Sequence, residues 1–246
     1  MSLPFFRRKN LSSHQSQIRL AKKRPAFRLD PILQLEERAV PASLIWDGNS
    51  ATLPNPNGGT GTWDTSTTNW WNGSTNVTWP AVSTLDDDAV FGLNPGTVSL
   101  NANLNANDMA FNASGYLITG SGNRTLTLDG TTPTVTVGAG LTATINTSSA
   151  TAANSAILAG TAGLTKNGNG TLLLRWSNAG GADNNTFVPH TFTGGVVVNG
   201  GTLQIQPVSN NDTSLKTNII NSANSLTLAG GTYSQGPSGD NFAVKQ

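Results

Sequence analysis

The sequence contains no cysteine, which excludes disulfide frameworks, cysteine zinc sites and cysteine nucleophiles. Charged residues are also scarce: they make up 11% of the 246 residues, against roughly 25% in ordinary soluble domains. No apolar run is long enough to span a membrane. The basic amino terminus is not followed by the apolar stretch of about 7 to 15 residues that a conventional secretory signal requires.

The net charge of +1 conceals two unlike segments. Residues 1–42 carry nine Lys or Arg and three acidic residues, which makes them +6. The remaining residues carry five Lys or Arg, ten Asp and no Glu, which makes them −5. Such a division predicts a disordered or short-helical basic segment over residues 1–43 and a separate body. The basic segment has no interleaved aromatic platform, so nucleic acid is not an expected partner.

The body shows the two-residue period of β-strands and no long helical period. In "RTLTLDG", Leu126 and Leu128 share one face while Thr125 and Thr127 share the other. Gly, Asn and Ser clusters between such runs suit tight corners. The same alternation predicts inward pairs at three further places: Val135 with Val137, Leu203 with Ile205, and Leu226 with Leu228.

Repeated phrases distinguish between two all-β architectures. "GTLLL" and "GTLQI" begin 31 residues apart, whereas "GLTATI" and "GLTKNG" begin 23 apart. Constant strand phrases at variable spacing favour a parallel β-helix, a solenoid of about six coils with loop insertions. Residues 175–192 are the clearest insertion. The alternative is an antiparallel β-sandwich.

Five of the six tryptophans lie between positions 46 and 79, which predicts a Trp-rich first coil or cap over residues 44–96, before repeats over residues 97–246. Exposed rings in this segment could stack on sugars. The alternative is that the rings fill and close the first coil, which is favoured because large aromatics are usually buried. The glycan candidates are Trp63, Trp70, Trp71 and Trp79.

Candidates for catalysis or metal binding are few. Asp86, Asp87 and Asp88 offer oxygen atoms for calcium, but they lack the Asp-x-Asp-x-Gly spacing of a calcium loop, and an acidic turn explains them equally. His14 and His190 are the only histidines, and neither stands in a nucleophile motif. No catalytic residue, resident metal or cofactor is therefore assigned, and an enzyme is not expected.

Two stretches resemble a known family. "GLTKNGNGTLLL" at 163–174 and "HTFTGGVVVNGGTLQI" at 190–205 are similar to the autotransporter-associated β-strand repeat, also called the passenger-associated transport repeat. The similarity covers roughly residues 44–206. It implies a right-handed parallel β-helix passenger that is displayed on the cell surface or released from it, and it does not imply catalysis. The matching positions are Gly163 to Lys166, Gly168, Gly170 to Leu172, Phe192 to Gly195 and Asn199 to Leu203.

A second resemblance lies in "LQLEERAVPA" at 33–42. It is similar to a short amino-terminal sorting motif of planctomycete surface proteins, which implies transfer to the cell envelope and processing after Ala42. The plain alternative is a short amphipathic helix around residues 31–38 that caps the domain. The motif positions are Leu35, Glu36, Glu37, Arg38, Pro41 and Ala42.

Together these observations predict a secreted or cell-surface protein with a structural and adhesive role. A carbohydrate-binding module that uses the Trp-rich segment is the alternative, and a polysaccharide-degrading β-helix enzyme is a more remote one. The expected partners are cell-surface glycans or other envelope proteins. Self-association through an open end of the solenoid, or continuation into a longer chain, is also expected because an uncapped end leaves strand edges unpaired.

Overall fold

A computed structural model describes residues 43–48, 56–80, 87–148, 154–177, 188–208, 220 and 223–235. All of them fall within one compact unit, which runs from Ala39 to Gln246. These residues form β-strands and turns and contain no helix. Accordingly, the described part of the chain offers no helix long and apolar enough to cross a membrane.

The described residues form nineteen strands in three sheets of nine, seven and three strands. The nine-stranded sheet has the order β18-β16-β14-β11-β8-β5-β1-β3-β4, the seven-stranded sheet the order β19-β17-β15-β12-β9-β6-β2, and the three-stranded sheet the order β13-β10-β7. The strand bounds are β1 Ser43–Trp46, β2 Gly61–Trp63, β3 Trp70–Trp71, β4 Asn76–Val77, β5 Asp88–Phe91, β6 Thr97–Leu100, β7 Leu104–Ala106, β8 Met109–Phe111, β9 Tyr116–Gly120, β10 Gly122–Leu128, β11 Thr134–Val137, β12 Thr142–Ser148, β13 Asn154–Ala159, β14 Leu164–Asn167, β15 Thr171–Ser177, β16 Val196–Val198, β17 Thr202–Val208, β18 Leu226–Leu228 and β19 Thr232–Gln235.

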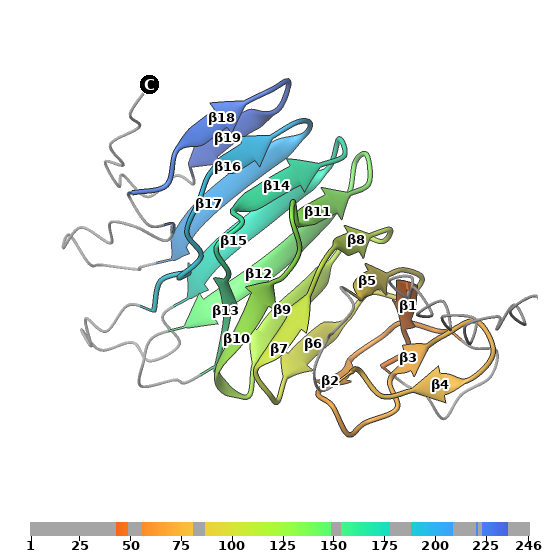
Figure 1. Ribbon diagram of the computed structural model, residues 1–246. Coiled ribbons are helices and arrows are strands. Elements are labelled where there is room, and N and C mark those ends of the chain that lie inside the picture. The colour runs from red at the N-terminus through yellow and green to blue at the C-terminus, as the bar shows by residue number, and fades with distance from the viewer. Residues whose placement is uncertain are drawn as a thin grey trace, which may run out of the picture. The chain divides into compact units, whose positions relative to one another are not determined.

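The chain visits the sheets in a fixed order (Figure 1). Three successive passes, β5-β6-β7, β8-β9-β10 and β11-β12-β13, each add one strand to the nine-stranded, the seven-stranded and then the three-stranded sheet. Later passes add β14-β15, β16-β17 and β18-β19 to the two larger sheets. Strands of successive passes pair in parallel, and only β1 with β3 and β3 with β4 pair antiparallel among the described strands. This pairing does not have the antiparallel organisation of a sandwich.

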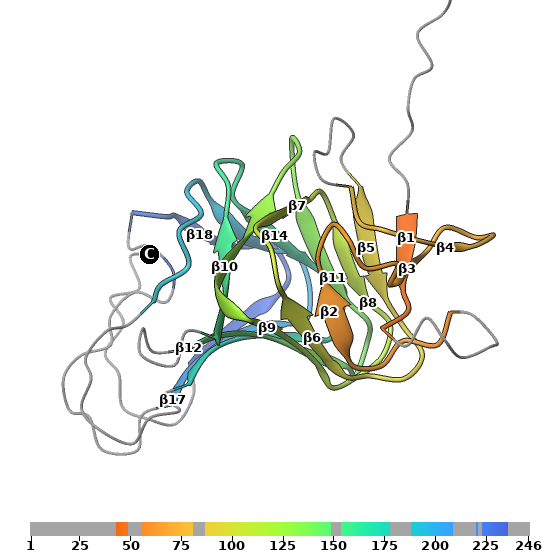
Figure 2. The same ribbon diagram turned by 90° about the horizontal axis from the view of Figure 1, so that it is seen from below.

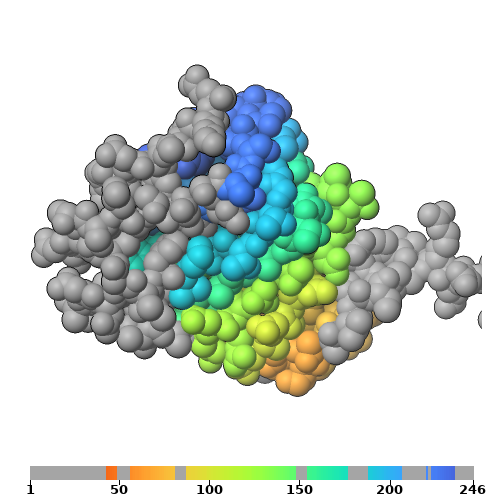
Figure 3. All heavy atoms as spheres, turned by 60° about the vertical axis from the view of Figure 1, so that its left-hand side comes forward, coloured from red at the N-terminus to blue at the C-terminus, as the bar shows by residue number. Residues whose placement is uncertain are grey.

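The repeated phrases of the sequence lie side by side in the structure. "GTLLL" enters β15 and "GTLQI" enters β17, and these strands pair in register with Thr171 opposite Thr202 and Leu172 opposite Leu203. A sequence separation of 31 residues therefore corresponds to one pass of the chain through the sheets. Successive passes form adjacent bands on the molecular surface, as the colours in Figure 3 show.

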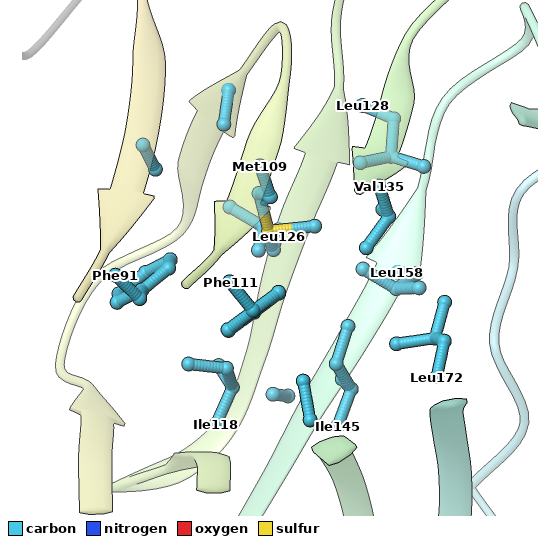
Figure 4. Packing of buried hydrophobic residues seen from close by; sticks show 14 of the residues in the cluster. Phe91, Met109, Phe111, Ile118, Leu126, Leu128, Val135, Ile145, Leu158 and Leu172 are labelled. Carbon is cyan, nitrogen blue, oxygen red and sulfur yellow. The ribbon is translucent and has the colours of Figure 1, made fainter. Parts of the chain in front are cut away.

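The sheets surround a common apolar interior (Figure 2). The expected alternation is confirmed in β10, where Leu126 and Leu128 are buried, and equally at the inward pairs of β11 and β17. Figure 4 shows Leu126, Leu128 and Val135 among the side chains of this interior. In β18 the expected inward pair is more exposed, with Leu228 52% exposed. The reason is that β18 has a neighbouring strand on one side only among the described residues, so its apolar face is half covered.

Glycine is required at the corners where successive passes approach each other closely. Gly201 has a φ of +62°, and a Cβ built there would collide with the carbonyl oxygen of Gly170 in the preceding pass. Gly163 has a φ of +85°, and a Cβ built there would collide with the carbonyl oxygen of Gly195 in the following pass. Both glycines belong to the repeated phrases, which links the phrase to the corner it forms.

The Trp-rich segment belongs to the same sheets as the repeats. β1 pairs in parallel with β5, and β2 pairs in parallel with β6, so both larger sheets continue across residue 97 without a break. What distinguishes this end is the antiparallel addition of β3 and β4 beyond β1.

Candidate functional site

The tryptophans of residues 46–79 form a buried cluster. Trp46, Trp63 and Trp70 are completely buried, and Trp79 is 1% exposed. The ring centroids of Trp63 lie 4.9 Å from those of both Trp70 and Trp79, in edge-to-face arrangements. Such pairs add to the stabilisation that burial of large apolar rings provides. The cluster continues through Phe91, which packs on three of these rings.

The register of β3 explains why adjacent tryptophans differ. Trp70 lies opposite Trp46 and points inward, whereas Trp71 lies opposite Ile45 and is only half-buried. Three of the four glycan candidates, Trp63, Trp70 and Trp79, present no ring face to solvent and occupy core positions. The indole N–H of Trp79 donates to the carbonyl oxygen of Asn105 at 2.9 Å.

The acidic run lies at the edge of the described residues. Asp86 is outside them, Asp87 is buried, and Asp88 begins β5, where its Oδ1 accepts a hydrogen bond from the side-chain amide of Asn107 at 3.0 Å. Within the described ranges, no cluster of three or more His, Cys, Asp or Glu side chains could hold a metal ion. The sorting positions Leu35, Glu36, Glu37, Arg38, Pro41 and Ala42 and the histidine His14 also lie outside the described residues.

Lys166 is a buried cation that the sequence did not single out. It occupies an inward position of β14, opposite Val135 on one side and Val198 on the other, and it has no exposed surface. Its Nζ donates to three carbonyl oxygens, those of Asn167 at 2.7 Å, Gly168 at 2.8 Å and Gly200 at 3.2 Å. Burial lowers its pKa to about 8. At pH 7 the ammonium is therefore mostly protonated, with its three donors all satisfied.

His190 is buried and acts as an acceptor for a strand edge. Its Nδ1 accepts a hydrogen bond from the backbone N–H of Leu158 in β13 at 3.0 Å. The neighbouring Thr191 and Phe192 donate their backbone N–H groups to the Leu158 carbonyl oxygen. Burial lowers the pKa of His190 to about 3, so the imidazole is neutral. This arrangement extends the pairing of the three-stranded sheet beyond β13, and the other ring nitrogen, Nε2, has no hydrogen-bond partner among the described residues.

The outward face of the seven-stranded sheet carries a regular polar array. Thr142, Thr171, Thr202 and Thr232 lie opposite one another on β12, β15, β17 and β19 and form a continuous threonine ladder. Adjacent rungs are separated by the strand spacing of about 4.8 Å. None of the seven strands contains Asp or Glu.

Arg175 is the cation on this face. It lies on β15 between Asn146 of β12 and Gln206 of β17, and its Nε donates to Asn146 Oδ1 at 3.1 Å. Its side chain is half-buried. No carboxylate of the described residues forms an ion pair with it. The Gly-Thr-Leu phrase of the sequence contains two of these threonines, Thr171 and Thr202, but the alignment of all four depends on strand register.

Comparison with known proteins gives one informative relative. The chain is 34% identical over 215 residues to a protein of Brucella suis biovar 1 (strain 1330), "Adhesin BmaC autotransporter", and the match covers 82% of this chain. That relative is an adhesin by name. The match spans only 6% of the relative's length. No protein-family model and no solved structure matches the chain.

Proposed function

We propose that the chain is a passenger-type segment of a secreted or cell-surface adhesive protein and that it is not an enzyme. The observation that carries this proposal is the 34% identity to an autotransporter adhesin over 82% of the chain. The parallel sheets support it, because they offer a long, regular outer surface on which binding residues can be placed.

The proposed architecture is a right-handed parallel β-helix. Three passes in succession through the same three sheets, paired in parallel and in register, favour a solenoid. The right-handed sense follows from the general preference of parallel crossover connections. Within this scheme residues 1–43 form a sorting segment, residues 44–96 form a Trp-rich first coil, and residues 97–246 form the repeats.

We further propose that residues 35–42 direct the protein to the envelope as a planctomycete-type sorting motif, with processing after Ala42. Mass spectrometry of the amino terminus in envelope and cytoplasmic fractions tests this. A start at Ser43 is expected in the envelope fraction. An intact amino terminus in surface-exposed protein would refute processing at Ala42.

The adhesive function is tested with the purified 246-residue chain immobilised on beads. Beads that carry the chain are expected to adhere to cells or to glycan-coated surfaces more strongly than beads that carry a denatured sample of the same chain. Protease shaving of native cells provides the second measurement and is expected to release peptides from residues 43–246. Adhesion at the level of the denatured control, together with protection from protease in intact cells, would refute the proposal.

A further inference from the structure

We propose that the outward face of the seven-stranded sheet docks a hydroxyl-rich polysaccharide that carries carboxylate groups, with Arg175 binding one carboxylate. This inference rests on the proposed adhesive function and names the ligand class and the surface. It requires no residue of the Trp cluster, whose rings are mostly buried.

The first argument is the chemistry of the face. Its outward positions bear hydroxyl and amide side chains, which donate and accept hydrogen bonds as sugar hydroxyls do. The threonine ladder runs across four successive strands from Thr142 to Thr232. Leu117 and Leu173 lie on the same face in the neighbouring column and provide apolar contact for the faces of sugar rings. A linear repeating polymer suits a surface whose groups repeat at each strand.

The second argument is the distribution of charge. The body carries ten Asp against five Lys or Arg, yet the strands of this sheet contain no acidic residue. Asp88 is in the nine-stranded sheet, and Asp129 follows β10 of the three-stranded sheet. Asp64 directly follows β2 at one edge of this sheet, where its Oδ1 accepts hydrogen bonds from the backbone N–H groups of Ser66 and Thr67. An anionic ligand therefore meets a cation and no strand carboxylate on this sheet.

The third argument is the orientation of Arg175. Its Nε bond to Asn146 holds the guanidinium over the sheet, and its remaining N–H groups have no protein acceptor among the described residues. Arginine binds carboxylates with two parallel hydrogen bonds. One ordered cation among many hydroxyl groups matches a polysaccharide with spaced carboxylates. A nucleic acid, with a phosphate on every nucleotide, is bound by many cations together.

The experiment measures binding of the full chain to hyaluronan, a polysaccharide with a carboxylate on every second sugar, with dextran and double-stranded DNA as comparison probes. Arg175→Gln is expected to weaken hyaluronan binding about tenfold or more, the equivalent of one charge-assisted hydrogen bond. Arg124→Gln is the matched control, because Arg124 lies in β10 of the three-stranded sheet and its removal changes the net charge equally. That control is expected to bind as the wild type does.

A second pair of variants tests the ladder without changing charge. Thr171→Val with Thr202→Val removes two adjacent hydroxyls from the face and is expected to weaken hyaluronan binding severalfold. Thr134→Val with Thr165→Val makes the same change at a paired, half-buried position of the nine-stranded sheet and is expected to have no effect. Thermal unfolding followed by circular dichroism confirms that each variant is folded.

Three outcomes would overturn the inference: no binding of hyaluronan by the wild type, equal losses in the two arginine variants, or DNA binding as tight as hyaluronan binding. If the beads described above still adhere while hyaluronan binding is absent, the ligand assignment fails and the adhesive function stands. If adhesion itself is absent, the proposed function fails independently of the probe.

Discussion

Replacement of Lys166 by methionine tests whether a buried cation joins successive passes of the chain. Methionine has a similar length and keeps the apolar part of the side chain, but it removes the ammonium. The carbonyl oxygens of Asn167, Gly168 and Gly200 then lose the donor that they share. Because Asn167 and Gly168 precede β15 whereas Gly200 precedes β17, the ammonium links two adjacent corners.

Two opposing effects set the magnitude. Burial lowers the Lys166 pKa from 10.5 to about 8, which corresponds to about 3 kcal/mol of unfavourable desolvation at 1.36 kcal/mol per pH unit. Each hydrogen bond from a charged donor contributes about 1.5–3 kcal/mol. The lowered pKa means that these bonds do not fully offset the desolvation of the ammonium. Methionine relieves that desolvation but leaves three carbonyl oxygens without their donor, at about 1–3 kcal/mol each, so Lys166→Met is expected to lower the free energy of unfolding by about 3 kcal/mol. For a unit of this size the thermal midpoint would fall by ~6–12 °C.

Urea denaturation followed by far-UV circular dichroism measures this change. Thr165→Ala is the control, because Thr165 is the outward neighbour in β14 and its truncation is expected to change the free energy of unfolding by about 0.5 kcal/mol or less. A Lys166→Met variant as stable as the wild type would refute the reasoning, since the three carbonyl oxygens would then lose their donor without a net cost.

The lowered pKa gives this prediction a second readout. Between pH 8 and 10.5 the unfolded chain retains the Lys166 proton while the folded chain releases it. The unfolded state therefore binds more protons, and stability from this residue rises with pH across that window. The rise is expected to be absent from Lys166→Met. Equal pH dependence of the two proteins above pH 8 would show that Lys166 does not titrate as proposed.

Three further predictions concern the core and the corners. Burial lowers the pKa of His190 from 6.5 to about 3. Between pH 6.5 and pH 3 the unfolded state therefore binds more protons, and the free energy of unfolding falls by about 1.4 kcal/mol for each pH unit of acidification. His190→Asn, measured by urea denaturation at pH 7 and pH 5, should lack this loss. Trp70→Ala should lower the free energy of unfolding by about 3–5 kcal/mol. Trp71→Ala should lower it by much less, because that ring is half-buried. Similar losses of stability in the two variants would contradict the register of β3. Gly201→Ala should lower the free energy of unfolding by about 2 kcal/mol or more, because φ is positive there and the Cβ would meet Gly170. A calorimetric midpoint equal to that of the wild type would contradict the conformation assigned to this corner.

The parallel pairing of repeated phrases was accessible from the sequence, but the details of the interior were not. The alternation of leucine and threonine in "RTLTLDG" fixed which side of β10 is buried, because side chains alternate across a strand. The same alternation places Lys166 inward with Leu164, yet its charge argues against that position. Only the three carbonyl oxygens around Nζ make burial tolerable, and they come from two corners that the chain brings together in space.

The Trp-rich segment illustrates the same limit. Its composition concentrates large rings in one place, but adjacent Trp70 and Trp71 cannot be assigned to interior and surface without the register of β3 against β1. Likewise, the threonine ladder depends on the exact opposition of Thr171 and Thr202, which a loop of variable length conceals in the sequence.

Pairing of β15 with β17 shows how such a chain can vary its binding surface without changing its fold. The inward positions repeat, with Leu172 opposite Leu203 and Leu174 opposite Ile205. The outward positions diverge after the shared threonine, with Leu173 opposite Gln204 and Arg175 opposite Gln206. Glycine at the corner and leucine in the core determine how the passes stack. The outward side chains do not fill the core, so they can change without altering its packing. Ligand specificity is therefore expected to reside in the outward positions that do not repeat, of which Arg175 is the charged member on this sheet.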